Sequence, residues 1–147
     1  MNAVKKSPAT SFLDSNIWLY AFTKTPEKEH KRKRRLAKKT IGESNVVISG
    51  QVINETCVNL IKKADLSEEA IQALISSFYG KYSVVEIEKN VLIHASQLRE
   101  KYSFAFWDSI IVSAALSAGC KTLYSEDMQD GLEIEGSLRI VNPFRSS

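Results

Sequence analysis

Four acidic residues stand at similar points of the amino-acid sequence: Asp14, Glu55, Asp108 and Asp127. Each comes just after a predicted strand or within the first turns of a predicted helix. Right-handed crossovers bring such positions to one edge of a parallel sheet, so we expect the four carboxylates to lie close together. Like charges at close range raise each other's pKa values or require a cation. A set of oxygen ligands without His or Cys favours Mg²⁺ or Mn²⁺.

A carboxylate-held ion of this kind indicates hydrolysis of phosphodiester bonds. The ion would polarise a phosphoryl oxygen, lower the pKa of a bound water molecule and shield the leaving oxyanion. Each acid also has a simpler explanation. Asp14 can cap a helix, Glu55 can be a solvated residue stabilised in the first turn of its helix, and Asp127 can be a turn residue. Asp108 is harder to explain in this way, because its predicted position faces the apolar side of its helix.

A basic segment accompanies these acids. Residues 24–39 contain nine of the 20 Lys and Arg residues and only two acids, so their net charge is +7 and that of the remaining chain is −4. Such a segment can bind the backbone of a polyanion without reading its sequence. The side chains that we expect to contact RNA are Arg32, Arg34, Arg35 and Lys38. The alternative is a solvent-exposed helix face without a ligand.

Strands and helices alternate nearly throughout the chain, which predicts a single α/β domain with a parallel sheet in three layers. The predicted strands are residues 11–13, 46–48, 83–87, 121–124 and 137–141. The predicted helices are residues 17–22, 25–39, 51–64, 67–78, 91–102 and 107–118. Two helix boundaries have specific signals, an N-cap at Ser67 and a left-handed stop at Gly119.

Composition is ordinary for a soluble protein, with 147 residues, 44% hydrophobic and 25% charged. We expect one domain over residues 1–147, with residues 1–10 as a flexible N-terminal tail. Cys57 and Cys120 have no metal-ligand spacing, which predicts buried free thiols in a reducing compartment. The N-terminus is not typical of a secretory signal, and the most apolar run, residues 110–118, is too short to span a membrane. These features predict a cytoplasmic protein without membrane contact.

The order and spacing of five short segments extend over nearly the whole chain. The segments are Phe12-Leu13-Asp14-Ser15-Asn16, Asn54-Glu55, Trp107-Asp108-Ser109-Ile110-Ile111, Leu123-Tyr124-Ser125-Glu126-Asp127-Met128-Gln129-Asp130-Gly131 and Ile140-Val141-Asn142-Pro143-Phe144. Together they resemble the PIN-domain ribonucleases, and in particular the VapC-type toxins of bacterial and archaeal toxin–antitoxin pairs. One difference is Gly131, where many relatives have an aromatic residue.

The resemblance implies a five-stranded parallel sheet with helices on both faces. It implies that Mg²⁺ or Mn²⁺ is held by an acidic quartet, namely Asp14, Glu55, Asp108 and Asp127. The residues implied to support that site are Asn16 and Ser125, with Asp130 as a further acid. It also implies a homodimer, an RNA substrate and a cognate antitoxin whose tail inserts near the acidic pocket.

We therefore predict a metal-dependent endoribonuclease that acts as the toxin of a toxin–antitoxin pair. The main alternative is a catalytically silent PIN-like module that binds RNA or a partner protein. A receiver-like phosphoacceptor module is a poorer explanation. It would need a lysine after the last strand, and here Asn142 and Pro143 follow Val141.

Overall fold

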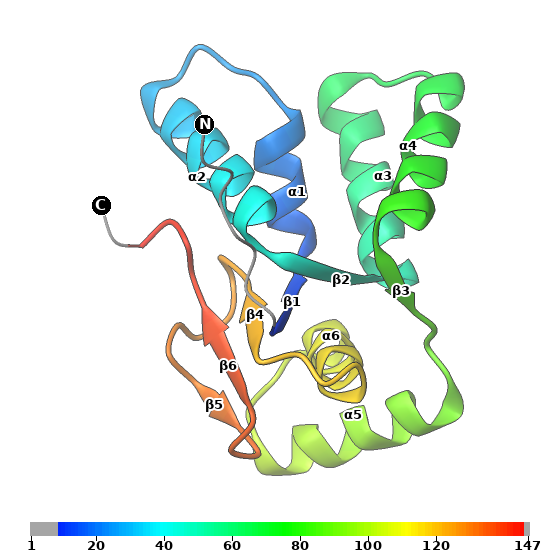
Figure 1. Ribbon diagram of the computed structural model, residues 1–147, viewed down its shortest axis with the longest axis vertical. Coiled ribbons are helices and arrows are strands. Elements are labelled where there is room, and N and C mark those ends of the chain that lie inside the picture. The colour runs from blue at the N-terminus through cyan, green and yellow to red at the C-terminus, as the bar shows by residue number, and fades with distance from the viewer. Residues whose placement is uncertain (1–8, 146–147) are drawn as a thin grey trace.

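The computed structural model describes residues 9–145 of the chain (Figure 1). The strands are β1 (Thr10–Leu13), β2 (Asn45–Ser49), β3 (Ser83–Val85), β4 (Thr122–Tyr124), β5 (Glu133–Ile134) and β6 (Leu138–Val141). The helices are α1 (Ser15–Phe22), α2 (Lys28–Glu43), α3 (Gly50–Ala64), α4 (Glu68–Lys81), α5 (Lys89–Lys101) and α6 (Phe106–Ser117). The predicted tail lies outside the described residues up to position 8, whereas Thr10 already belongs to β1.

The strands form one sheet in the order β3-β2-β1-β4-β6-β5. The pairs among the first five of these strands are parallel, which confirms the predicted fold class. The predicted number of five strands was wrong, because β5 adds an antiparallel pair at the edge next to β6. A two-residue strand is too short to leave a periodic signal. Its turn places both Glu135 and Gly136 in the left-handed region, with φ of 51° and 68°.

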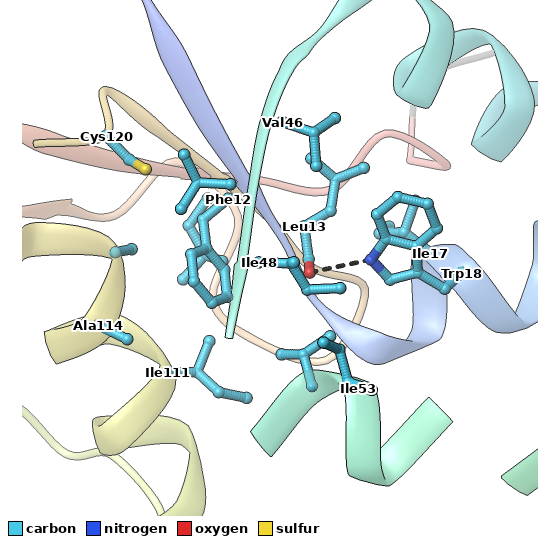
Figure 2. Close-up of a cluster of buried hydrophobic side chains, with 14 of the residues drawn as sticks. Phe12, Leu13, Ile17, Trp18, Val46, Ile48, Ile53, Ile111, Ala114 and Cys120 are labelled. Atoms are coloured by element: carbon cyan, nitrogen blue, oxygen red, sulfur yellow. Dashed lines mark hydrogen bonds between the residues drawn. The ribbon is translucent and has the colours of Figure 1, made fainter. Parts of the chain in front are cut away.

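Helices cover both faces of the sheet, with α1 to α4 on one side and α5 and α6 on the other (Figure 1). Successive side chains of a strand point to opposite faces. Accordingly, Phe12 lies beside Ile111 of α6, whereas Leu13 lies beside Trp18 of α1 (Figure 2). The indole Nε1 of Trp18 donates to the carbonyl oxygen of Leu13 at 3.4 Å, so this ring is both packed and hydrogen-bonded. The core therefore fixes β1 between two helical layers.

Two predicted helix boundaries are confirmed. The hydroxyl of Ser67 accepts a hydrogen bond from the backbone N–H of Ala70 at the start of α4. Gly119 follows the C-cap of α6 and has a φ of 70°. Glycine adopts this left-handed backbone conformation at little cost because it has no Cβ. These signals are local, which explains why the sequence alone could place them.

Other boundaries differ from the prediction. Helix α2 begins at Lys28, so Pro26 precedes it, and it continues to Glu43 rather than residue 39. Helix α3 begins at Gly50, so Glu55 lies beyond its first turn and the macrodipole explanation for that residue was wrong. Trp107, at the start of α6, is 64% exposed. It lies in the first turn, which extends past the core.

The two cysteines are free and buried, as predicted for Cys57 and Cys120. Burial raises the pKa of both thiols, which disfavours the reactive thiolate. Within residues 9–145, none of the helices combines the length and the apolar character that crossing a membrane requires.

Candidate active site

Asp14 follows β1 directly and caps α1. Its side chain is buried, with 4% of the residue exposed. Oδ1 accepts from the backbone N–H of Ser15 at 2.7 Å, and Oδ2 accepts from the hydroxyl of Ser125 at 2.8 Å. The pKa of Asp14 is raised to about 6, chiefly by burial and to a smaller extent by the charges of Glu55 and Asp108, while the two hydrogen bonds act to lower it. Asp14 is thus both a helix cap and a member of an acidic cluster.

Glu55 reaches the same place from the second turn of α3. Its Oε2 accepts from the hydroxyl of Ser15 at 3.2 Å, and its Oε1 accepts from the amide of Gln51 at 2.9 Å. The Gln51 amide also donates to the carbonyl oxygen of Trp107 at 3.2 Å. Gln51 therefore ties Glu55 to the start of α6. The sequence offered a signal for it, since residues four apart share a helix face.

Asp108 lies in the first turn of α6 and is half-buried. Burial raises its pKa, and the negative charges of Asp127 and Glu55 raise it further. These charge effects show that Asp108 lies near Asp127 and Glu55. The start of α6 therefore places a third carboxylate at the same edge of the sheet. The prediction that the four carboxylates lie close together agrees with these mutual charge effects.

Asp127 comes from the loop after β4. Its Oδ2 accepts from the side-chain amide of Asn16 at 3.1 Å, and Asn16 Oδ1 accepts from the backbone N–H of Glu126 at 3.3 Å. The backbone N–H of Asp127 donates to the Ser125 hydroxyl oxygen at 3.3 Å. Asn16 and Ser125 therefore both hold the loop that carries this carboxylate.

The chemistry of these donors fits a hard divalent cation. All of the converging groups are carboxylates, and two of them have raised pKa values that a positive ion would lower. Among residues 9–145, no three or more His, Cys, Asp or Glu side chains are already arranged as a metal-binding group.

The PIN domain family model matches residues 11–130, which include all four acids. The chain belongs to the PIN domain family. The resemblance seen in the sequence is thereby confirmed at the level of the family. No match was found among curated proteins.

Solved structures of toxin proteins share this PIN fold. A toxin–antitoxin complex from Klebsiella pneumoniae is 21% identical with a TM-score of 0.67, and the match covers 91% of this chain and 98% of that one. The FitAcB structure from Neisseria gonorrhoeae is 20% identical with a TM-score of 0.65, covering 93% and 100%. The VapC20 toxin of Mycobacterium tuberculosis, which cleaves the sarcin–ricin loop, is 16% identical with a TM-score of 0.59, covering 78% and 87%. Identities this low show a common fold only.

Asp130, predicted as a further acid of the site, makes a different contact in this PIN domain. Its Oδ1 accepts from the backbone N–H of Asn142 at 2.8 Å. Gly131 follows with φ of 87°, and its N–H donates to the carbonyl of Ile140 at 2.8 Å. Asp130 and Gly131 together shape the turn that leads to β5 and hold it against the end of β6.

A second polar cluster, which the sequence did not reveal, surrounds Glu126. The ammonium of Lys33 contacts Oε2 at 2.5 Å, and the hydroxyl of Tyr20 donates to Oε1 at 2.8 Å. The Lys33 ammonium also lies over the rings of Tyr20 and Phe144, at 5.1 and 5.8 Å from their centroids. Lys33 was visible only as one of many basic residues, since its partner lies 93 positions away.

The four basic residues predicted to contact RNA differ in exposure and in their contacts. Arg32 donates to the carbonyl oxygen of Phe144 and pairs with Glu29 at 3.1 Å. Arg34 is partly buried, and its Nε makes no hydrogen bond to any residue in the described range. Arg35 and Lys38 are exposed. Contact between these residues and RNA stays a prediction.

Two clefts flank the acidic cluster. The first, here called the apolar cleft, has a volume of about 760 Å³ and lies between α3, α6 and the segment after β3. Glu55, Glu86, Leu92 and Trp107 are among the residues that line it. The second, here called the polar cleft, has a volume of about 940 Å³. Its lining consists of Ser15, Asn16, Leu19, Tyr20, Phe22, Thr23, Lys24, Thr25, His30, Asn59, Lys63, Ala64, Glu126 and Asp127.

Proposed function

We propose that this PIN domain is a metal-dependent endoribonuclease that acts as the toxin of a toxin–antitoxin pair. The observation that carries the proposal is the convergence of four carboxylates around the buried Asp14. They come from the N-cap of α1, from α3, from the start of α6 and from the loop after β4. Its membership of the PIN family and the similarity to toxin structures support the same function.

The proposed ligands of Mg²⁺ or Mn²⁺ are Asp14, Glu55, Asp108 and Asp127. An ion bound there would polarise a phosphoryl oxygen of the RNA and lower the pKa of a water molecule. The surrounding polar residues hold the carboxylate oxygens in place. Ser125 and the Ser15 backbone fix Asp14, whereas Asn16 fixes Asp127. Fixed oxygens reduce the reorganisation that ion binding requires, as outer-shell partners do in other metal sites.

We further propose a cognate antitoxin, a homodimer and a cytoplasmic location. Several similar structures contain an antitoxin with the toxin, which supports the first of these. The apolar cleft beside Glu55 would accept an apolar segment of such a partner, because exposed Leu92 and Trp107 line it. Two free buried thiols agree with a reducing compartment.

The decisive experiment is to incubate the purified protein with a mixed pool of cellular RNA, with Mg²⁺ or Mn²⁺ and with EDTA, beside Asp108→Asn. Discrete products that require the ion and are absent with the variant are the expected result. Cleavage by both proteins would mean a contaminating nuclease or a misplaced site. If the unsubstituted parent protein cleaves no RNA with either ion, the proposed ribonuclease activity is contradicted.

The main alternative is compatible with the same structure. A catalytically silent module that binds RNA or protein would share the PIN fold and the same four acids. Titration of Mn²⁺ by calorimetry, beside the cleavage assay, separates the two proposals. The enzyme requires both cleavage and Mn²⁺ binding that Asp14→Asn weakens, whereas Mn²⁺ binding without any cleavage would favour the silent module.

A further inference from the structure

We propose that the phosphate backbone of a single RNA strand lies in the polar cleft, where Lys24 and Lys63 contact it, rather than along the outer surface of α2. The inference rests on the proposed nuclease and adds the path of its substrate. The polar cleft reaches the acidic cluster directly, because Asn16 and Asp127 form part of its lining. A strand in this cleft would therefore meet the carboxylates.

Each of two walls of the polar cleft, one formed by α1 and the loop after it and one by α3, carries a lysine. Helices α1 and α3 run side by side (Figure 1). Lys24 follows α1, and Lys63 lies in the last turn of α3. Since the eight residues of α1 span about 12 Å, Lys24 lies roughly one helix length from Asn16. The two lysines would thus contact the RNA backbone about one helix length from the carboxylates, beyond the phosphate that is cleaved.

The charges of the polar cleft leave these lysines available. Glu126 lines the cleft, but Tyr20 and Lys33 engage its two oxygens, so its charge is compensated. Lys24 and Lys63 form no ion pair with any residue that the structure describes. Both are exposed. An extended polyanion would release counterions from its backbone on binding them.

The loop that carries Lys24 is held at its base. The hydroxyl of Thr23 donates to the carbonyl of Leu19 at 2.7 Å. His30 Nε2 lies 3.1 Å from the Thr23 carbonyl oxygen and 3.0 Å from its hydroxyl oxygen. Because both of those oxygens act as acceptors, the Nε2–H tautomer fits this contact. Anchoring at Thr23 reduces the entropy that Lys24 loses when it binds a phosphate.

The apolar cleft is a poor path for the backbone. Its lining contains Glu55 and Glu86, and none of its residues is Lys, Arg or His. A phosphate entering it would meet negative charge without compensation. A base or an apolar partner segment suits its Leu92 and Trp107 side chains better.

The outer surface of α2 also lacks a route to the acids. Lys33 points to Glu126, next to Asp127. Residues two positions away on a helix are rotated by about 200°, so Lys31 and Arg35 project away from that site. Arg32 is occupied by Glu29 and the Phe144 carbonyl. Cations on this surface therefore have no path that would place an RNA backbone over the cluster.

The test compares two charge-matched double variants, Lys24→Gln/Lys63→Gln and Lys31→Gln/Arg35→Gln. Binding of a labelled single-stranded RNA of mixed sequence and about 20 nucleotides, longer than the roughly 4–16 nucleotides that one single-strand-binding fold covers, is measured in EDTA from about 50 to about 200 mM salt. We expect the cleft variant to weaken binding by about 10-fold and to reduce the salt slope by about 1.4, which is two contacts at about 0.7 each. The α2 variant should stay within about 2-fold of the parent.

A larger loss with the α2 variant, or equal losses with both, would overturn the proposed path. Melting temperatures within a few degrees of the parent would show that both variants fold. Cleavage by the parent is followed in parallel with Mn²⁺. If the parent cleaves and the cleft variant binds like the parent, only this inference fails. If the parent neither binds nor cleaves, the proposed function fails with it.

Discussion

The hydroxyl of Ser125 donates to Oδ2 of Asp14 at 2.8 Å, and this bond joins the ends of two neighbouring strands. Leu13 of β1 pairs with Tyr124 of β4, so the residues that follow each strand are brought side by side. The bond lowers the pKa of a carboxyl group that burial would otherwise raise further. Ser125 therefore helps to set the charge of the central acid.

Replacing Ser125 with Ala should raise the pKa of Asp14 further and shift the acidic limb of the cleavage profile to higher pH. The loss of one buried hydrogen bond should also cost about 1 kcal/mol of unfolding free energy. Ser113→Ala is the matched control, because its hydroxyl is also buried and donates to the Val91 carbonyl at 2.7 Å, outside the site. Both variants should be destabilised, but only Ser125→Ala should change the pH profile of cleavage. Identical profiles would contradict this role.

Replacing Asp14 with Asn should reduce RNA cleavage by more than about 100-fold, because a central ligand of the proposed ion loses its charge. The exposed acid Glu133 provides a control, and Glu133→Gln should cleave like the parent. Initial rates with Mn²⁺ on one defined RNA product measure the difference. Comparable rates for both variants would place the chemistry elsewhere.

The stability of the metal-free protein should depend on the ionisation of Asp14. Its pKa is about 6 in the folded state against 3.8 in the unfolded chain, so the folded state holds its proton more tightly. The contribution of Asp14 to stability should therefore be greatest below about pH 4 and should fall, by about 3 kcal/mol, as the pH rises through about 6. Urea unfolding in EDTA across this range measures the slope.

The same experiment on Asp14→Asn separates this group from the other acids. The variant should lose most of the slope and be more stable than the parent at pH 7 by roughly 1–2 kcal/mol. The gain is smaller than the full 3 kcal/mol because one amide oxygen cannot replace both carboxylate acceptors of Asp14. If the unfolding free energy of the variant depends on pH as steeply as that of the parent, titratable groups other than Asp14 determine the pH dependence of stability in this range.

Lys33→Gln should loosen the loop that carries Asp127, because the ammonium holds the neighbouring Glu126. We expect a loss of about 1 kcal/mol in unfolding free energy, as for a partly buried ion pair. We also expect half-maximal cleavage to require a higher Mn²⁺ concentration. Arg139→Gln is the control, since its pairing with Glu133 spans 3.9 Å and both side chains are well exposed. That variant should differ from the parent by less than about 0.5 kcal/mol. Equal effects of the two changes would assign Lys33 no special role.

Much of the fold could be predicted because its signals are local. Short apolar runs marked the five parallel strands, and period-3.6 patterns marked the helices between them. The stop at Gly119 followed from backbone sterics, and the cap at Ser67 from the unpaired N–H groups of a helix start. The positions of Asp14 and Asp108 relative to these elements then placed both acids at one edge of the sheet.

Tertiary structure alone decided which side chains meet. Periodicity reports that one face of a helix is covered, but not by which partner, so it could not assign Lys33 to Glu126 or turn Asp130 toward the Asn142 backbone. Nor could it show that Trp107 stays exposed at the end of the core. Local backbone preferences determine the elements, whereas contacts between distant residues depend on how those elements pack. That is why the sequence predicted the acidic edge, and only the packed chain separated its two clefts.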